Sequence, residues 1–117
     1  MGMGLEDVLV GLKEETEAIA SAIVSRDGLV IASDLPEGVS AETFSIMCAA
    51  IMGAAMTTTT EMGRSAPSRI LLESEDLLIV IYEADRRSML VVVLPPEADL
   101  SRVDARVNQV VEQVAAA

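Results

Sequence analysis

The sequence predicts a layered α/β sandwich, in which five strands form a sheet and helices are available for both of its faces. Apolar residues recur at helical spacing in three segments, near the start, in the middle and at the end of the chain. Short aliphatic runs bounded by turn residues fill the two intervals between these segments. The resulting order is helix, two strands, helix, three strands, helix, which suits two helical layers around one sheet.

The first helix is predicted over residues 4–16, where leucines and a valine recur on one face. A β-hairpin follows, because β-rich runs at 18–25 and 29–33 flank a short turn that contains Asp27 and Gly28. A tight hairpin turn needs positive φ angles, and an Asp-Gly pair supplies them.

The second helix is predicted over residues 41–62, with Ser40 as its N-cap and Gly63 as its left-handed end. Residues 43–60 carry no charge, and a helix that is apolar all round is buried on more than one side. We expect one stripe of this helix to face the sheet, formed by Phe44, Met47, Cys48, Ile51, Ala55, Thr58 and Met62.

Three strands are predicted at 69–73, 77–82 and 89–94. The first alternates and has charged ends, which suits an edge strand. The other two are continuous apolar runs, which suit central strands covered on both faces.

The last helix is predicted from about residue 100, where valines recur at helical spacing. Ser101 with Asp104 resembles a capping box at its start. No internal repeat, low-complexity segment or linker interrupts the sequence, so residues 1–117 are predicted to form one domain.

The composition restricts the partners of the protein. A net charge of −11 over 117 residues repels nucleic acid, whose phosphates need clustered Lys and Arg. The mean hydropathy of +0.45 is high for so short a chain, because small domains bury a smaller share of their surface. This apolar excess indicates an interface with another protein.

Cys48 is the only cysteine, which excludes an internal disulfide and fits a reducing compartment. The sequence shows no secretory signal pattern, and we therefore predict a cytoplasmic protein. The strongly apolar part of the second helix, residues 44–56, is too short to cross a bilayer of about 30 Å, so no membrane span is predicted.

Catalysis is not expected, and neither a cofactor nor a metal is predicted. The chain contains no histidine, the commonest acid–base at neutral pH and the commonest metal ligand. It contains no phosphate-binding loop and no G-x-G-x-x-G turn. Cys48 lies in an apolar run, where cysteine behaves as a small hydrophobe. The cluster of Glu73, Glu75 and Asp76 is interpreted as a solvated turn.

Two surfaces are predicted to be left for a second copy of the chain. The other stripe of the second helix has small side chains, which allow a helix to approach closely. The strand at 69–73 is an edge that can meet its own copy antiparallel across a two-fold axis. The alternatives are that the first or last helix covers the small stripe, and that Arg69 and Glu73 keep the edge unpaired. The predicted dimer interface contains Ile46, Ala49, Ala50, Gly53, Thr57, Thr60, Arg69, Ile70, Leu71, Leu72 and Glu73.

The elements together form a recognisable pattern. Aliphatic strands flank the Asp-Gly turn within 22–32, a long Ala/Met-rich helix covers 42–63, and paired strands at 69–73 and 77–83 precede a Val-rich strand at 89–94. In this order the chain resembles the Roadblock family of dynein light chains and their prokaryotic relatives, over nearly its whole length.

This resemblance implies a profilin-like sandwich of the order α-β-β-α-β-β-β-α with a five-stranded antiparallel sheet. It also implies a non-catalytic homodimer, formed through the long helix and the third strand, that regulates or scaffolds a small Ras-like GTPase. The helix pair and its adjoining loops are then the expected docking surface. One alternative is a structural subunit of a motor or polarity complex without a nucleotide-dependent partner. A small-molecule sensor is less suited to so few aromatic residues.

Overall fold

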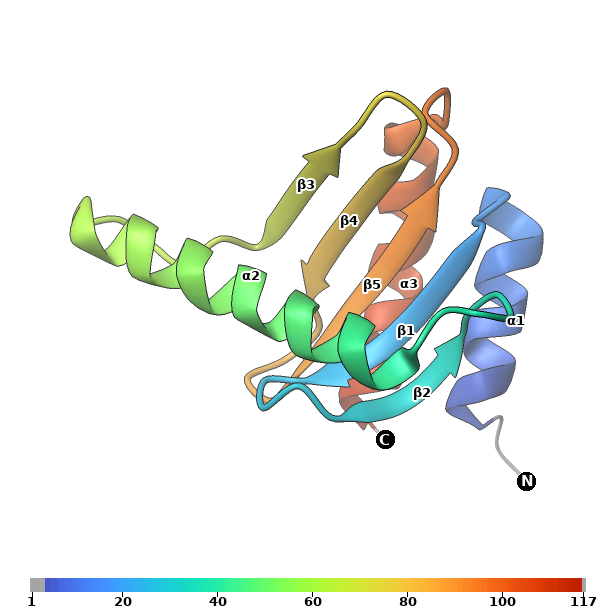
Figure 1. Ribbon diagram of the computed structural model, residues 1–117, viewed down its shortest axis with the longest axis horizontal. Helices are drawn as coiled ribbons and strands as arrows, with labels where there is room; N and C mark the ends of the chain where they lie inside the picture. Colours follow the sequence, from blue (N-terminus) through green and yellow to red (C-terminus); the bar gives the residue numbers. More distant parts are fainter. Residues whose placement is uncertain (1–3, 117) are drawn as a thin grey trace.

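The computed structural model describes residues 4–116, and it confirms the predicted order of elements (Figure 1). Residues 1–3 and 117 of the predicted domain lie outside the described part of the chain. The elements are α1 (Leu5–Thr16), β1 (Ala20–Ser25), β2 (Val30–Asp34), α2 (Ala41–Glu61), β3 (Arg69–Glu73), β4 (Leu78–Glu83), β5 (Ser88–Leu94) and α3 (Leu100–Ala116).

The five strands form one antiparallel sheet in the order β2-β1-β5-β4-β3. The strand at the centre is β5, and every one of its residues is buried. This arrangement confirms that the two continuous apolar runs are central strands and that the strand at 69–73 is an edge. The other edge strand is β2.

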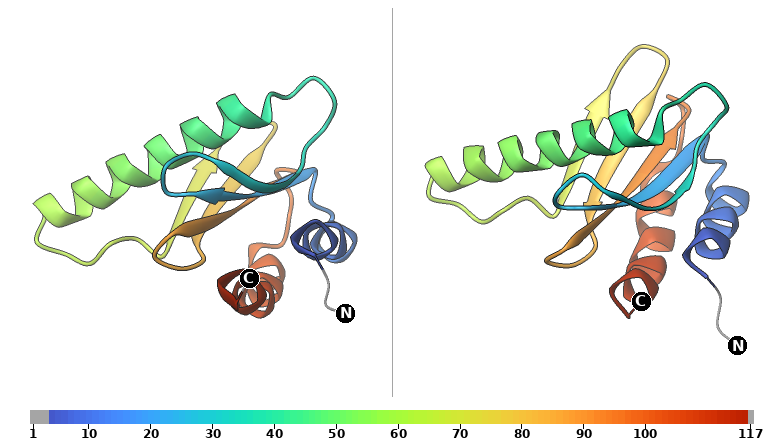
Figure 2. Two further views of the ribbon diagram at one scale, coloured as in Figure 1. Left: turned by 90° about the horizontal axis from the view of Figure 1, so that it is seen from below. Right: turned by 60° about the horizontal axis from the view of Figure 1, so that its bottom comes forward.

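The helices form two layers of unequal size (Figures 1 and 2). On one face of the sheet, α1 and α3 lie side by side and bury a large core that includes Leu9, Leu12, Val107 and Leu90. On the other face α2 lies alone, over a smaller core. The fully or nearly fully buried members of this smaller core are Ala22, Val24, Cys48, Met52, Ile81, Met89 and Val91.

Both predicted ends of α2 are confirmed. The Ser40 hydroxyl oxygen accepts a hydrogen bond from the Thr43 N–H at 3.2 Å, which satisfies a free donor of the first turn. Gly63 follows the helix with a φ of +70°, in the left-handed region that glycine adopts without a steric penalty.

The predicted rotation of α2 about its axis is correct only in part, because Phe44, Cys48 and Ile51 of the predicted stripe pack on the core beneath the helix. Met47, Thr58 and Met62 were expected to face the sheet, and all three are exposed. Ser45 and Met52, which lie outside the predicted stripe, are buried together with Cys48. The physical reason is that an uncharged helix carries no polar face that marks its outer side.

The start of α3 also differs from the expectation. Asp99 caps the helix, because its Oδ1 accepts from the N–H groups of Ser101 at 3.1 Å and Arg102 at 3.3 Å. Asp104 lies one turn further along and points toward the sheet, where its Oδ1 accepts from the Tyr82 hydroxyl at 2.6 Å.

By length and composition alone, α2 qualifies as a helix that could cross a membrane, so the length argument from the sequence was too strict. However, Cys48 and Met52 pack against Val24 and Val91 of the sheet. Membrane insertion would expose the apolar face of the sheet under α2, and the composition of this one helix is therefore weak support for a span.

The buried thiol of Cys48 gives a direct test of how firmly α2 is seated. Burial raises the pKa of this thiol from 9.0 to about 11, which lowers its thiolate fraction at pH 8 about a hundredfold. We expect Ellman's reagent to label the native protein at least about a hundredfold more slowly than the urea-unfolded protein.

A matched control is Met47→Cys in a Cys48→Ala chain, because position 47 is the exposed neighbour on the same helix. This thiol should react at nearly the unfolded rate. Equal labelling rates for the two positions in native protein would contradict the packing of α2 on the sheet.

Candidate interaction surface

The two edges of the sheet differ in regularity. The register between β1 and β2 shifts between Ile23 and Val24, so that Ile31 is an extra residue on the edge strand. By contrast, β3 pairs with β4 without any shift, from Arg69 opposite Tyr82 to Glu73 opposite Leu78. A bulge hinders pairing with a further strand, and β3 is therefore the better template for strand pairing.

The edge strand β3 carries apolar side chains that the helical layers cover only in part. Leu71 is 42% exposed and Leu72 is 38% exposed. The register places Leu71 beside Val80, on the face of α1 and α3, and Leu72 beside Ile79, on the face of α2. The strand thus exposes leucines on both faces, and within residues 4–116 no strand pairs with its outer backbone groups.

The outward face of α2 is lined by small residues: Ala50, Gly53, Ala54 and Thr57 are all exposed. A Cβ placed on Gly53 would meet no atom within 4 Å. The C-terminal half of the helix extends beyond the β3 edge of the sheet (Figures 1 and 2). Neither α1 nor α3 covers this face, because both lie on the opposite side of the sheet.

The predicted interface residues lie on two elements, α2 and β3, and the C-terminal half of α2 extends past the β3 edge. Ile46 lies apart from this edge, beside the β1–β2 turn. Two of the predicted residues, Ala49 and Ile70, are half-buried and pack against the core beneath α2. Ala54 was missed, because the predicted stripe was rotated toward the β1–β2 hairpin. The exposed members are Ile46, Ala50, Gly53, Thr57, Thr60, Arg69, Leu71, Leu72 and Glu73. Their contact with a second copy stays a prediction.

Arg69 already has a partner within the chain. Its guanidinium forms an ion pair with Asp104 of α3, which also accepts the hydrogen bond from Tyr82. Burial raises the pKa of Tyr82, and the hydrogen bond to Asp104 raises it further, so this hydroxyl remains a donor. These three residues connect the start of β3 to α3. The sequence analysis missed this role of Asp104, because it interpreted the residue as part of a capping box.

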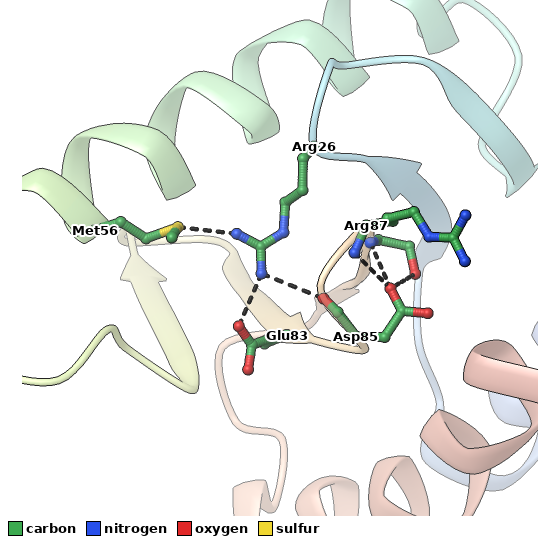
Figure 3. Close-up of polar contacts among 6 residues, drawn as sticks. Arg26, Met56, Glu83, Asp85 and Arg87 are labelled. Carbon is green, nitrogen blue, oxygen red and sulfur yellow. Dashed lines mark hydrogen bonds and ion pairs between the residues drawn. The ribbon is translucent and has the colours of Figure 1, made fainter.

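The polar cluster around Arg26 was not predicted (Figure 3). One nitrogen of the guanidinium, Nη1, donates to the Met56 sulfur at 2.9 Å. The other, Nη2, donates to the Glu83 carboxylate at 2.8 Å and to the Asp85 carbonyl at 3.3 Å. This side chain therefore joins the β1–β2 turn, the C-terminal half of α2, and β4 with its following turn.

The turn that receives Arg26 is itself ordered by Asp85. The Oδ1 of Asp85 accepts from the N–H groups of Arg87 and Ser88, both at 2.8 Å, and from the Ser88 hydroxyl at 2.9 Å (Figure 3). The hydrogen bond from the Arg87 N–H is the main reason why the pKa of Asp85 lies below its usual value. The Asp85 carbonyl is thereby held in place for the guanidinium.

Within residues 4–116, no group of three or more His, Cys, Asp or Glu side chains is placed so that it could hold a metal ion. Glu73, Glu75 and Asp76 are exposed around the β3–β4 turn. Cys48 is buried, and its raised pKa makes the thiolate scarce at neutral pH.

These features define a small α/β sandwich with one regular open edge and one long helix that has an unpartnered face. The sequence model of the Roadblock/LC7 domain matches residues 4–94. The chain belongs to the Roadblock/LC7 domain family.

Individual relatives agree with this assignment. The uncharacterized protein MJ0714 of Methanocaldococcus jannaschii is 30% identical over 112 residues, which cover 96% of this chain and 94% of that protein. Among solved structures, Myxococcus xanthus MglB superposes with a TM-score of 0.89 at 16% identity, over 94% of this chain and 90% of that one. The Roadblock/LC7 domain from Streptomyces avermitilis gives 0.89 at 18% identity, over 97% and 96% of the two chains.

The sandwich is also profilin-like, as the resemblance implied. Profilin IA of Acanthamoeba castellanii superposes with a TM-score of 0.63 at 16% identity, over 93% of this chain and 91% of that one. At this identity the likeness establishes the shared fold alone.

Removal of the Arg26 guanidinium should loosen α2. We expect Arg26→Leu to lower the free energy of unfolding by about 1 kcal/mol, a value kept small because Arg26 and Glu83 are partly exposed. Hydrogen exchange should become faster in α2 around Met56, because the link to the hairpin is lost.

Arg86→Leu is the matched control, since Arg86 is exposed in the β4–β5 turn and forms no ion pair within residues 4–116. Its stability, measured by urea denaturation, should change by less than about 0.5 kcal/mol. Equal effects of the two variants would show that the guanidinium does not hold α2.

Proposed function

We propose that this protein is a non-catalytic homodimeric interaction module that regulates or scaffolds a small Ras-like GTPase. The observation that carries the dimer is the pair of uncovered surfaces formed by the small-residue face of α2 and the regular edge strand β3. Membership of the Roadblock/LC7 family supports the role in GTPase regulation. We place the protein in the cytoplasm.

In the dimer that we propose, two β3 strands pair antiparallel about a two-fold axis at Leu71. Arg69 of each copy then lies opposite Glu73 of the other, so that a positive and a negative side chain face each other at both ends of the strand pair. The result is one sheet that is continuous across both subunits.

The overhang of α2 fits the same arrangement. Its C-terminal half extends past β3 and so would lie over the second subunit (Figure 1). There it would shield Ile70 and Ile79, which are only half-buried within one chain. The exposed Ala50, Gly53 and Thr57 allow the two helices to approach at the low end of the usual spacing of about 8–10 Å.

A second candidate function is a structural subunit of a motor or polarity complex, without a nucleotide-dependent partner. The acidic surface suits either role, because a net charge of −11 favours any partner with a basic patch. Dependence on the nucleotide state is what separates the two candidates.

The dimer surface is tested by Gly53→Glu combined with Leu71→Arg. We expect this variant to be a monomer by light scattering, because it places charges at both parts of the contact. Both positions are open in the single chain, so the circular dichroism spectrum should be unchanged.

The matched control is Gly11→Glu combined with Val10→Arg, which introduces the same two charges on the exposed side of α1. This control should remain a dimer. A second measurement uses Leu71→Cys in a Cys48→Ala chain, which should form an intersubunit disulfide at the two-fold axis, where opposed Cα atoms lie about 4.5–5.5 Å apart. A dimeric charge variant would show that another surface is used.

The GTPase role is tested with the Ras-like GTPases of the source organism, each loaded with GDP or with a non-hydrolysable GTP analogue. We expect one of them to bind the wild-type dimer at least about tenfold more tightly in one nucleotide state, a difference of about 1.4 kcal/mol. Calorimetry gives the two affinities. Equal affinities would favour the structural subunit, and no binding in either state would contradict the GTPase role.

A further inference from the structure

A second apolar surface lies at the opposite edge of the sheet from β3, where the β1–β2 turn meets the N-terminal half of α2 (Figure 1). The two elements enclose a small cleft of about 240 Å³. This volume lies below the usual range of about 300–1,000 Å³ for small-molecule sites, so the cleft suits one or two side chains. It is lined by Asp27, Gly28, Leu29, Val30, Glu42 and Ile46.

The walls of the cleft are aliphatic and open to solvent. Leu29 is 67% exposed and Ile46 is 53% exposed. Gly28 has a φ of +89°, and a Cβ at this position would come within 3.1 Å of the Ile46 Cα. The turn therefore rests directly on the helix backbone, and the cleft is preformed between two packed elements.

Two carboxylates, those of Asp27 and Glu42, stand among these aliphatic side chains. The acidic residues that form ion pairs within residues 4–116 are others: Glu15, Asp34, Glu83 and Asp104. A site that combines uncovered leucine and isoleucine with two uncompensated negative charges is complementary to a basic side chain with a long aliphatic stem.

We propose that this cleft docks a segment of a partner protein in which an arginine or lysine stands beside aliphatic residues. The stem of the basic side chain lies against Leu29 and Ile46, and its cationic head lies between Asp27 and Glu42. The same cleft of a second copy is a poor occupant, because the charged residues that line the cleft, Asp27 and Glu42, are both acidic. The bulge in β2 disfavours capture by strand pairing, so side chains make the contact.

This cleft is separate from the dimer surface of the proposed function. The two lie at opposite edges of the sheet, and Ile46 alone borders both. A dimer formed through β3 would carry one cleft near each end of its continuous sheet. The inference requires neither the dimer nor a GTPase.

The test is an NMR titration of ¹⁵N-labelled protein with the peptide acetyl-Val-Arg-Leu-amide. We expect saturable shifts confined to residues 27–30 and 42–46, with a dissociation constant in the millimolar range, about −4 kcal/mol. The same peptide with citrulline in place of arginine keeps the shape and loses the charge, and it should bind at least about fivefold more weakly.

The protein variant for this test is Asp27→Asn combined with Glu42→Gln. Asn-Gly forms the same hairpin turn as Asp-Gly, so the fold is retained. We expect about a fivefold loss of affinity for the arginine peptide. Glu75→Gln combined with Glu97→Gln removes two exposed charges elsewhere and should leave the affinity unchanged.

Shifts spread over the whole acidic surface, equal binding of the citrulline peptide, or an unchanged affinity of the Asp27/Glu42 variant would each overturn the proposal. Light scattering on the same samples reports the oligomeric state independently. A failed titration with an intact dimer therefore rejects the cleft alone, and a monomer that binds the peptide rejects the dimer alone.

Discussion

The course of α2 over the sheet is the constraint on which the rest of this structure depends. This helix runs across the strands and not along them, and its C-terminal half extends beyond the β3 edge (Figures 1 and 2). Two helices, α1 and α3, cover one face, but α2 is alone on the other. It is seated through Cys48 and Met52, and the face of the sheet toward β3 stays partly open.

Where apolar coverage ends, polar links hold the elements in place. Arg26 joins the C-terminal half of α2 to the β1–β2 turn and to β4, beyond the point where α2 packs fully on the sheet. Asp104 similarly holds Arg69 at the start of β3, which no helix covers. These charge-assisted contacts order an edge strand and a helix end without hiding their apolar side chains. The surfaces thus stay exposed and well ordered, which suits recognition of another protein.

The sequence allowed the element order, the edge position of β3 and the ends of α2 to be predicted, because each depends on local patterns such as apolar periodicity, charged strand ends and a Ser or Gly at a cap. The rotation of α2 was predictable only in part, since its uncharged sequence has no polar side. The roles of Arg26 and Asp104 were not predictable. Arg26 contacts Glu83, which is 57 residues further along the chain. Asp104 occupies the position that an acidic residue has in a capping box, although it accepts a hydrogen bond from Tyr82 instead. Both depend on how distant segments meet.

The two ends of the sheet are chemically different, and the difference bears on what each can bind. The β3 end is regular, exposes leucine, and carries a positive and a negative residue on one strand, so it is complementary to its own copy. The β2 end is bulged, and its cleft is lined by aliphatic side chains and two carboxylates. A two-fold axis that passes through this cleft would bring like charges together, because Asp27 and Glu42 are both acidic. A chain with these two ends can pair with itself at one and is left with the other for an unlike, basic partner.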